Sequence, residues 1–163
     1  MVRLRNRPDH SHRTSKPQEL LMPTVQRTIA TSAPPTRALL YLLDFENAVE
    51  WDSGTVSCEL LSGDGSPGTV WHNVSKFAGR KVDLDYTLER VSQTSFVIVG
   101  RNETTTSRDT ITVVPDGSGS SVDYRAEFSF TGLGRFLWPV AMPLLNKLGN
   151  DTARTLKTAL DRL

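Results

Sequence analysis

Residues 122–130 read Val-Asp-Tyr-Arg-Ala-Glu-Phe-Ser-Phe, a strict alternation of apolar and polar side chains. Because successive side chains of a β-strand point to opposite faces, the pattern predicts a strand with one covered and one solvated face. The stretch 81–89 alternates in the same way and places Val82, Leu84, Tyr86 and Leu88 on its apolar side. Two such strands predict an antiparallel sheet whose apolar face needs a cover.

The C-terminal segment supplies that cover. After Gly132-Leu133-Gly134, leucines and alanines recur at helical spacing opposite charged side chains, which predicts one long amphipathic helix to the end of the chain. Its expected apolar stripe comprises Leu137, Ala141, Leu144, Leu145, Leu148, Leu156, Leu160 and Leu163. Pro139 and Pro143 leave two alternatives, a kink in the first turns or a regular helix that begins only near Pro143.

The remaining segments fit around these elements. Turn sequences at near-regular intervals between Gly54 and Thr131 predict a six-stranded meander. Residues 24–31 are rich in β-branched side chains and predict a further strand, which ends at Ser32-Ala33-Pro34-Pro35, a typical helix entry. Apolar spacing then predicts two short helices before Trp51, a candidate core residue. The predicted class is α+β, a curved antiparallel sheet of about seven strands wrapped around a long C-terminal helix.

The length of 163 residues favours a single domain. Residues 1–22 carry five Lys or Arg against two carboxylates and show no apolar period, so we expect a disordered basic extension whose removal leaves stability unchanged. Met22, directly before the first predicted strand, is an alternative start of the chain. The predicted folded domain is 23–163.

Composition excludes several classes of function. A net charge of +1 gives no general attraction for nucleic acid. Only Cys58 and three histidines are present, which predicts no disulfide, no metal site and no cofactor, and favours a cytoplasmic location. No apolar run approaches the roughly 18 residues of a membrane span, so no membrane insertion is expected.

Several short motifs resemble a known family. They are Ser32-Ala33-Pro34-Pro35, Leu42-Leu43-Asp44-Phe45-Glu46-Asn47, Glu50-Trp51-Asp52, Gly63-Asp64-Gly65 with Gly68-Thr69, Asp109 ahead of the Gly-Ser turn and Val122-Asp123-Tyr124, and Phe130-Thr131-Gly132. Together they resemble the polyketide cyclase/dehydrase-like family of the START and Bet v 1-like (SRPBCC) superfamily. The resemblance implies a helix-grip fold with an apolar cavity between the sheet and the long helix.

Three functions follow from that expectation. The first is binding or carriage of a small hydrophobic ligand, such as a lipid or polyketide. The second is a polyketide aromatase/cyclase-type enzyme. The third is a regulatory or toxin-like protein that acts through a protein partner.

Strand parity and helix position supply the candidate site residues. The expected cavity lining is Tyr86, Leu88, Ile98, Tyr124, Phe128, Met142 and Leu145. His72, the sole histidine of the predicted folded part, is a weak catalytic candidate if Val70, His72 and Val74 share the covered face. The opposite parity places Trp71 inside instead.

Overall fold

The computed structural model describes residues 22–132 and 138–163. The chain begins with β1 (Thr24–Thr31), α1 (Pro35–Leu43), the 3-10 helix η1 (Phe45–Asn47) and α2 (Ala48–Trp51). It continues through β2 (Thr55–Ser62), β3 (Val70–Phe77), β4 (Arg80–Val91), β5 (Ser95–Arg101), β6 (Thr105–Asp116) and β7 (Gly119–Phe130). It ends with α3 (Trp138–Leu160).

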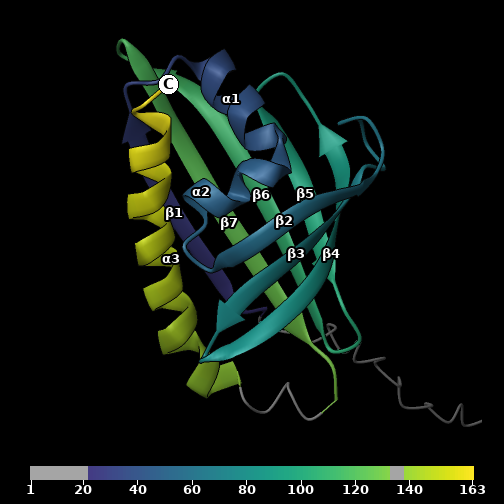
Figure 1. The fold of residues 1–163 in the computed structure, drawn as a ribbon. Coiled ribbons are helices and arrows are strands. Elements are labelled where there is room, and N and C mark those ends of the chain that lie inside the picture. The colour runs from purple at the N-terminus through teal and green to yellow at the C-terminus, as the bar shows by residue number, and fades with distance from the viewer. Residues whose placement is uncertain (1–21, 133–137) are drawn as a thin grey trace, which may run out of the picture.

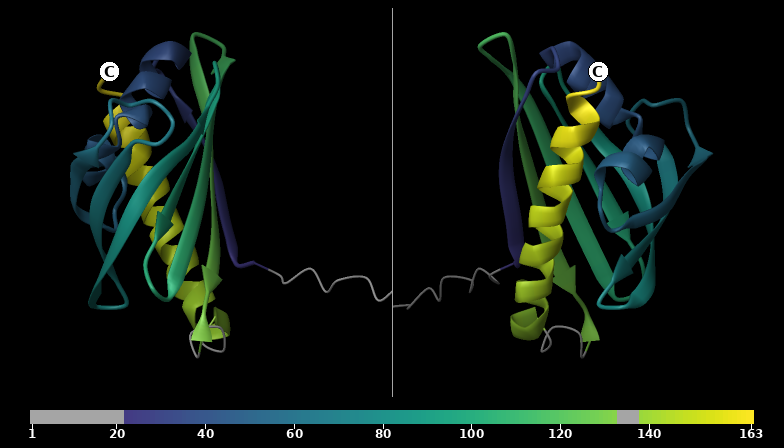
Figure 2. Two further views of the ribbon diagram at one scale, coloured as in Figure 1. Left: turned by 90° about the vertical axis from the view of Figure 1, so that its right-hand side faces the viewer. Right: turned by 60° about the vertical axis from the view of Figure 1, so that its left-hand side comes forward.

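The seven strands form one antiparallel sheet in the order β1-β7-β6-β5-β4-β3-β2. β2 to β7 follow one another as a meander, and β1 pairs with β7 along its whole length, from Thr24 opposite Glu127 to Thr31 opposite Ser120. The sheet curves around α3, which lies along its concave side (Figures 1 and 2). This is the helix-grip arrangement, so the predicted α+β fold is confirmed.

The short helices close one end of the sheet. Pro35 occupies the first turn of α1, where its missing N–H leaves no helical hydrogen bond unmade. α1 turns Ala38, Leu39 and Leu42 inward, and it packs against β6 and β7. Phe45 of η1 and Trp51 at the end of α2 belong to the same core cluster. The inward side chains of the short helices are therefore part of the core.

The long helix packs against β1 and α2. It begins at Trp138, so the alternative start near Pro143 is wrong, and Pro143 lies inside the helix. Gly149 permits the close approach to β1, because a Cβ at this position would collide with the side chain of Val25. Leu145, Leu156 and Leu160 are buried as predicted, whereas Leu144 is 42% exposed and does not belong to the buried stripe.

The predicted extension lies almost entirely outside the described residues, which begin at Met22. None of the helices in the described ranges combines the length and apolar character that a membrane span requires.

Candidate functional site

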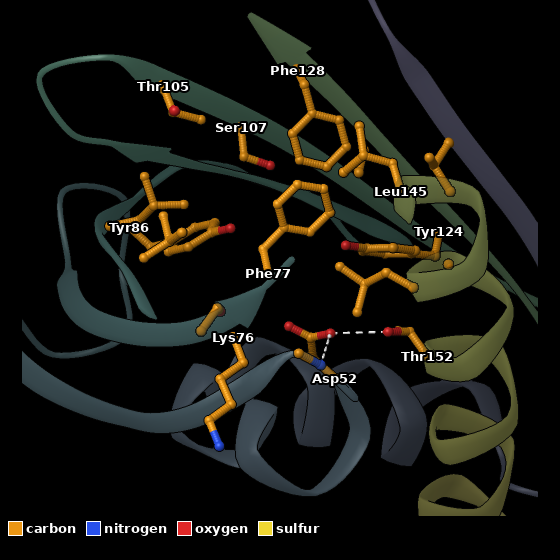
Figure 3. Close-up of a pocket in the computed structure, with 18 of the residues that line it drawn as sticks. Asp52, Lys76, Phe77, Tyr86, Thr105, Ser107, Tyr124, Phe128, Leu145 and Thr152 are labelled. Carbon is orange, nitrogen blue, oxygen red and sulfur yellow. Dashed lines mark hydrogen bonds between the residues drawn. The ribbon is translucent and has the colours of Figure 1, made fainter. Parts of the chain in front are cut away.

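A pocket of about 130 Å³ lies between the concave face of the sheet and α3 (Figure 3). Its walls come from β1, β3, β4, β6, β7 and the middle of α3, and they are mainly apolar and aromatic. The apolar and aromatic lining side chains are Val25, Phe77, Val82, Leu84, Tyr86, Tyr124, Ala126, Phe128, Phe130, Leu145 and Leu148. The exposed Lys76 and the half-buried Phe77 and Phe130 form the rim that faces solvent.

The structure places four of the seven proposed lining residues on this pocket, namely Tyr86, Tyr124, Phe128 and Leu145. Leu88 and Ile98 are elsewhere, in the core cluster, and each is 1% exposed. They share the concave face with Tyr86 but lie toward the end that α1 and η1 cover, where side chains fill the space. Met142 on α3 is half-buried and is not part of the pocket wall.

A glycine determines where the Tyr86 ring lies. Tyr86 on β4 is directly opposite Gly100 on β5, and a Cβ at residue 100 would be 2.6–2.8 Å from three carbons of the ring. The ring therefore lies over the glycine backbone and carries its hydroxyl into the pocket (Figure 3). Ser107, the partner of Gly100 on β6, lines the next part of the wall.

Replacing Gly100 with alanine is therefore expected to destabilise the protein by about 1–3 kcal/mol, the usual cost of overpacking a core. The measurement is urea unfolding followed by tryptophan fluorescence. A double-mutant cycle with Tyr86→Leu supplies the control, because the penalty should fall when the ring is absent. An equal penalty in both backgrounds would show that the ring is not what excludes a side chain at residue 100.

Asp109 on β6 is a functional candidate that the sequence interpretation missed. Its side chain is 3% exposed and accepts a 2.8 Å hydrogen bond from Ser107 Oγ. Burial raises the pKa of Asp109 to about 7, and the negative charge of Asp52 adds to the rise. A carboxyl group directly behind the pocket wall therefore titrates near neutral pH.

The two pocket tyrosines belong to the same polar group. Burial, reinforced by the charge of Asp109, raises the pKa values of Tyr86 and Tyr124 well above their ordinary range. Both hydroxyls stay protonated at neutral pH and point toward the centre of the pocket (Figure 3). Ser107, which donates to Asp109, lies between these carboxyl and phenol groups on the same wall.

Asp52, the residue after α2, supplies a second carboxylate to the wall. Its Oδ1 accepts from Thr152 Oγ1 of α3 at 2.9 Å and from the Gly54 N–H at 3.1 Å (Figure 3). Its Oδ2 accepts from Thr55 Oγ1 at 2.7 Å. These bonds join α2, β2 and α3 across the pocket. The Asp52–Thr152 contact spans 100 positions, so no local sequence signal could reveal it.

His72 does not face the pocket. Trp71 is buried on the concave side of β3, so His72 points outward, with its side chain 41% exposed. Its Nδ1 is 2.8 Å from Asp85 Oδ1, and this hydrogen bond raises the pKa of His72. The alternative that places Trp71 inside therefore holds, and His72 does not meet the condition of facing the cavity.

Cys58 and possible metal ligands offer no reactive centre in the described part of the chain. Cys58 is buried, and desolvation raises the pKa of its thiol to about 11, so it stays protonated. Within residues 22–132 and 138–163, no group of three or more His, Cys, Asp or Glu side chains is arranged to hold a metal ion.

Fold and site together define a helix-grip protein with an internal pocket. The family described as "Polyketide cyclase / dehydrase and lipid transport" matches residues 22–161, and the chain belongs to this family. A comparison with curated proteins finds no significant match.

Solved structures with the same fold have low sequence identity. The protein TTHA0849 from Thermus thermophilus has a TM-score of 0.73 at 19% identity, over 85% of this chain and 97% of that one. The Zhui aromatase/cyclase from Streptomyces sp. R1128 has a TM-score of 0.72 at 11% identity, over 86% and 94%. A START superfamily protein from Mycobacterium smegmatis has a TM-score of 0.66 at 17% identity, over 85% and 94%. These likenesses confirm the fold.

Proposed function

We propose that this protein binds, and thereby carries, a small hydrophobic ligand in the pocket between the sheet and α3. The observation that carries the proposal is the unfilled, mainly apolar volume of about 130 Å³ at the centre of the site. An apolar ligand in this pocket would remove its own surface and that of the lining from water, which contributes about 25 cal/mol per Å² of apolar surface.

The size and chemistry of the pocket indicate the kind of ligand. The volume is close to the roughly 150 Å³ of an engineered apolar cavity that takes up benzene. Stacking surfaces are available from Phe128, Phe77 and the two tyrosines. A compact aromatic body fits this lining, and a larger ligand would extend past the rim at Lys76.

An aromatase/cyclase-type enzyme is the second candidate, and Asp109 is the observation that favours it. A carboxyl group with a pKa of about 7 suits proton transfer from a carbon between two carbonyl groups. The resulting enolate would need hydrogen-bond donors or a cation to stabilise it. The described wall places the carboxylate of Asp52 in the pocket, and its one cationic residue, Lys76, is exposed, which favours binding over catalysis.

Two neighbouring residues of α3 give a matched test of the pocket. Leu145 lines it, whereas Leu144 is exposed. Leu145→Trp is expected to fill the space and weaken binding of 2-naphthamide at least tenfold, and Leu144→Trp should change it less than twofold. An NMR titration of ¹⁵N-labelled protein measures affinity and locates the binding site.

Thermal unfolding of both variants shows whether each is folded. If folded Leu145→Trp binds 2-naphthamide as tightly as the wild type, the pocket is not the binding site. If the wild-type protein shows no binding, the proposed function is wrong.

A further inference from the structure

We propose that the pocket selects uncharged ligands and rejects carboxylates. This inference rests on the proposed function and specifies the class of ligand. It is carried by the charges of the described wall.

The charged groups near the pocket centre are carboxyl groups. Asp52 lines the wall, and Asp109 lies behind Ser107, 3% exposed. Among the described lining residues, Lys76 is the sole Lys, Arg or His. It is exposed, and its ammonium group points away from the aromatic side chains (Figure 3). A bound carboxylate would therefore lose its hydration and meet like charge, with no cation beside it.

Two hydroxyls near the pocket centre donate to carboxyl groups of the protein. Ser107 Oγ donates to Asp109 Oδ1 at 2.8 Å, and Thr152 Oγ1 donates to Asp52 Oδ1 at 2.9 Å. The hydroxyls of Tyr86 and Tyr124 point into the pocket, and a phenol can donate a hydrogen bond to a ligand or accept one from it (Figure 3).

An uncharged ligand can exchange hydrogen bonds with the tyrosine hydroxyls without placing a charge near Asp52 and Asp109. A carboxylate could accept from the same hydroxyls, but it would still lie close to two carboxyl groups with no cation beside it. Charge is therefore the property by which the wall discriminates.

The test compares three ligands with one bicyclic body at pH 8 by NMR titration. 2-Naphthamide is uncharged and has N–H donors, 2-naphthoate has nearly the same shape but is an anion, and methyl 2-naphthoate is uncharged without a donor. We expect both uncharged ligands to bind at least tenfold more tightly than the carboxylate.

Asp109→Asn tests the origin of the discrimination, because the amide has the shape of the carboxyl group and retains an oxygen for Ser107. The variant should reduce the affinity ratio of amide to carboxylate at least fivefold. Asp123→Asn is the control. Asp123 is a carboxylate on the outer face of the same sheet, bonded to Gln26, and its replacement should leave the ratio unchanged.

The outcomes separate this inference from the proposed function. If 2-naphthoate binds in the pocket as tightly as the amide, charge selection is wrong while ligand binding stands. If the ester binds as weakly as the carboxylate, charge is not what separates the amide from the carboxylate. If Asp109→Asn leaves the affinity ratio of amide to carboxylate unchanged, Asp109 is not the source of the discrimination. If none of the three ligands binds, both proposals fail.

Discussion

Replacing Trp51 with alanine is expected to lower the free energy of unfolding by about 3–5 kcal/mol, the usual cost of deleting a large buried aromatic side chain. Trp51 is 1% exposed and packs edge-on against Phe45 and Tyr124, with ring centroids 5.9 and 6.1 Å apart. Its carbonyl oxygen also accepts a 2.6 Å hydrogen bond from Thr155 Oγ1 of α3. The side chain therefore fills the junction of α2, α3 and the sheet, and urea unfolding measures its contribution.

Trp51→Phe is the matched control. The indole Nε1 of Trp51 is buried and has no hydrogen-bond partner among the described residues. Replacing the indole with a phenyl ring therefore breaks no hydrogen bond. The phenylalanine variant should therefore lose much less stability than the alanine variant. An alanine variant as stable as the wild type would contradict the assignment of Trp51 to the core. A phenylalanine variant as unstable as alanine would show that the indole N–H matters.

The second large effect is a dependence of stability on pH that originates in Asp109. Its pKa is about 7 in the folded protein, against an ordinary value of 3.8. Between these two values the folded state binds more protons than the unfolded state, so the free energy of unfolding falls as the pH rises through this window. At about 1.4 kcal/mol per pKa unit, the full loss is roughly 4 kcal/mol, complete above pH 7.

Asp109→Asn should remove this loss, because an amide stays uncharged at every pH. We expect the difference in free energy of unfolding between variant and wild type to grow in favour of the variant from pH 5 to pH 8. Urea unfolding at a series of pH values measures it. Asp161 and Glu89, whose pKa values are lowered, also make stability depend on pH. Both residues are present in the variant and in the wild type, so their contributions cancel when the two free energies of unfolding are subtracted. Parallel stability curves would contradict the pKa shift.

The local pattern of apolar and polar residues along the sequence is enough to predict most of the fold. The alternation in 122–130 and 81–89 predicted which side chains face α3, and Tyr124, Ala126 and Phe128 do line the pocket. Strand faces are readable because side chains alternate with a period of two whatever the partner strand. Strand periodicity alone does not distinguish the pocket wall from the closed core, and it therefore predicts Leu88 and Ile98 as pocket residues together with Tyr86. That distinction depends on how far α1 and η1 extend over the sheet.

Sequence alone determined the order of the elements, the covered face of the two alternating strands and the amphipathic cover at the C-terminus. Tertiary structure alone decided the chemistry of the site. Asp109 lies in Ser-Arg-Asp-Thr-Ile, where polar residues occupy both faces and no apolar pattern marks the buried one. Asp52 meets Thr152 only when α3 is in place. Periodicity is a property of neighbours along the chain, whereas burial and charge proximity depend on segments that meet only in the folded protein.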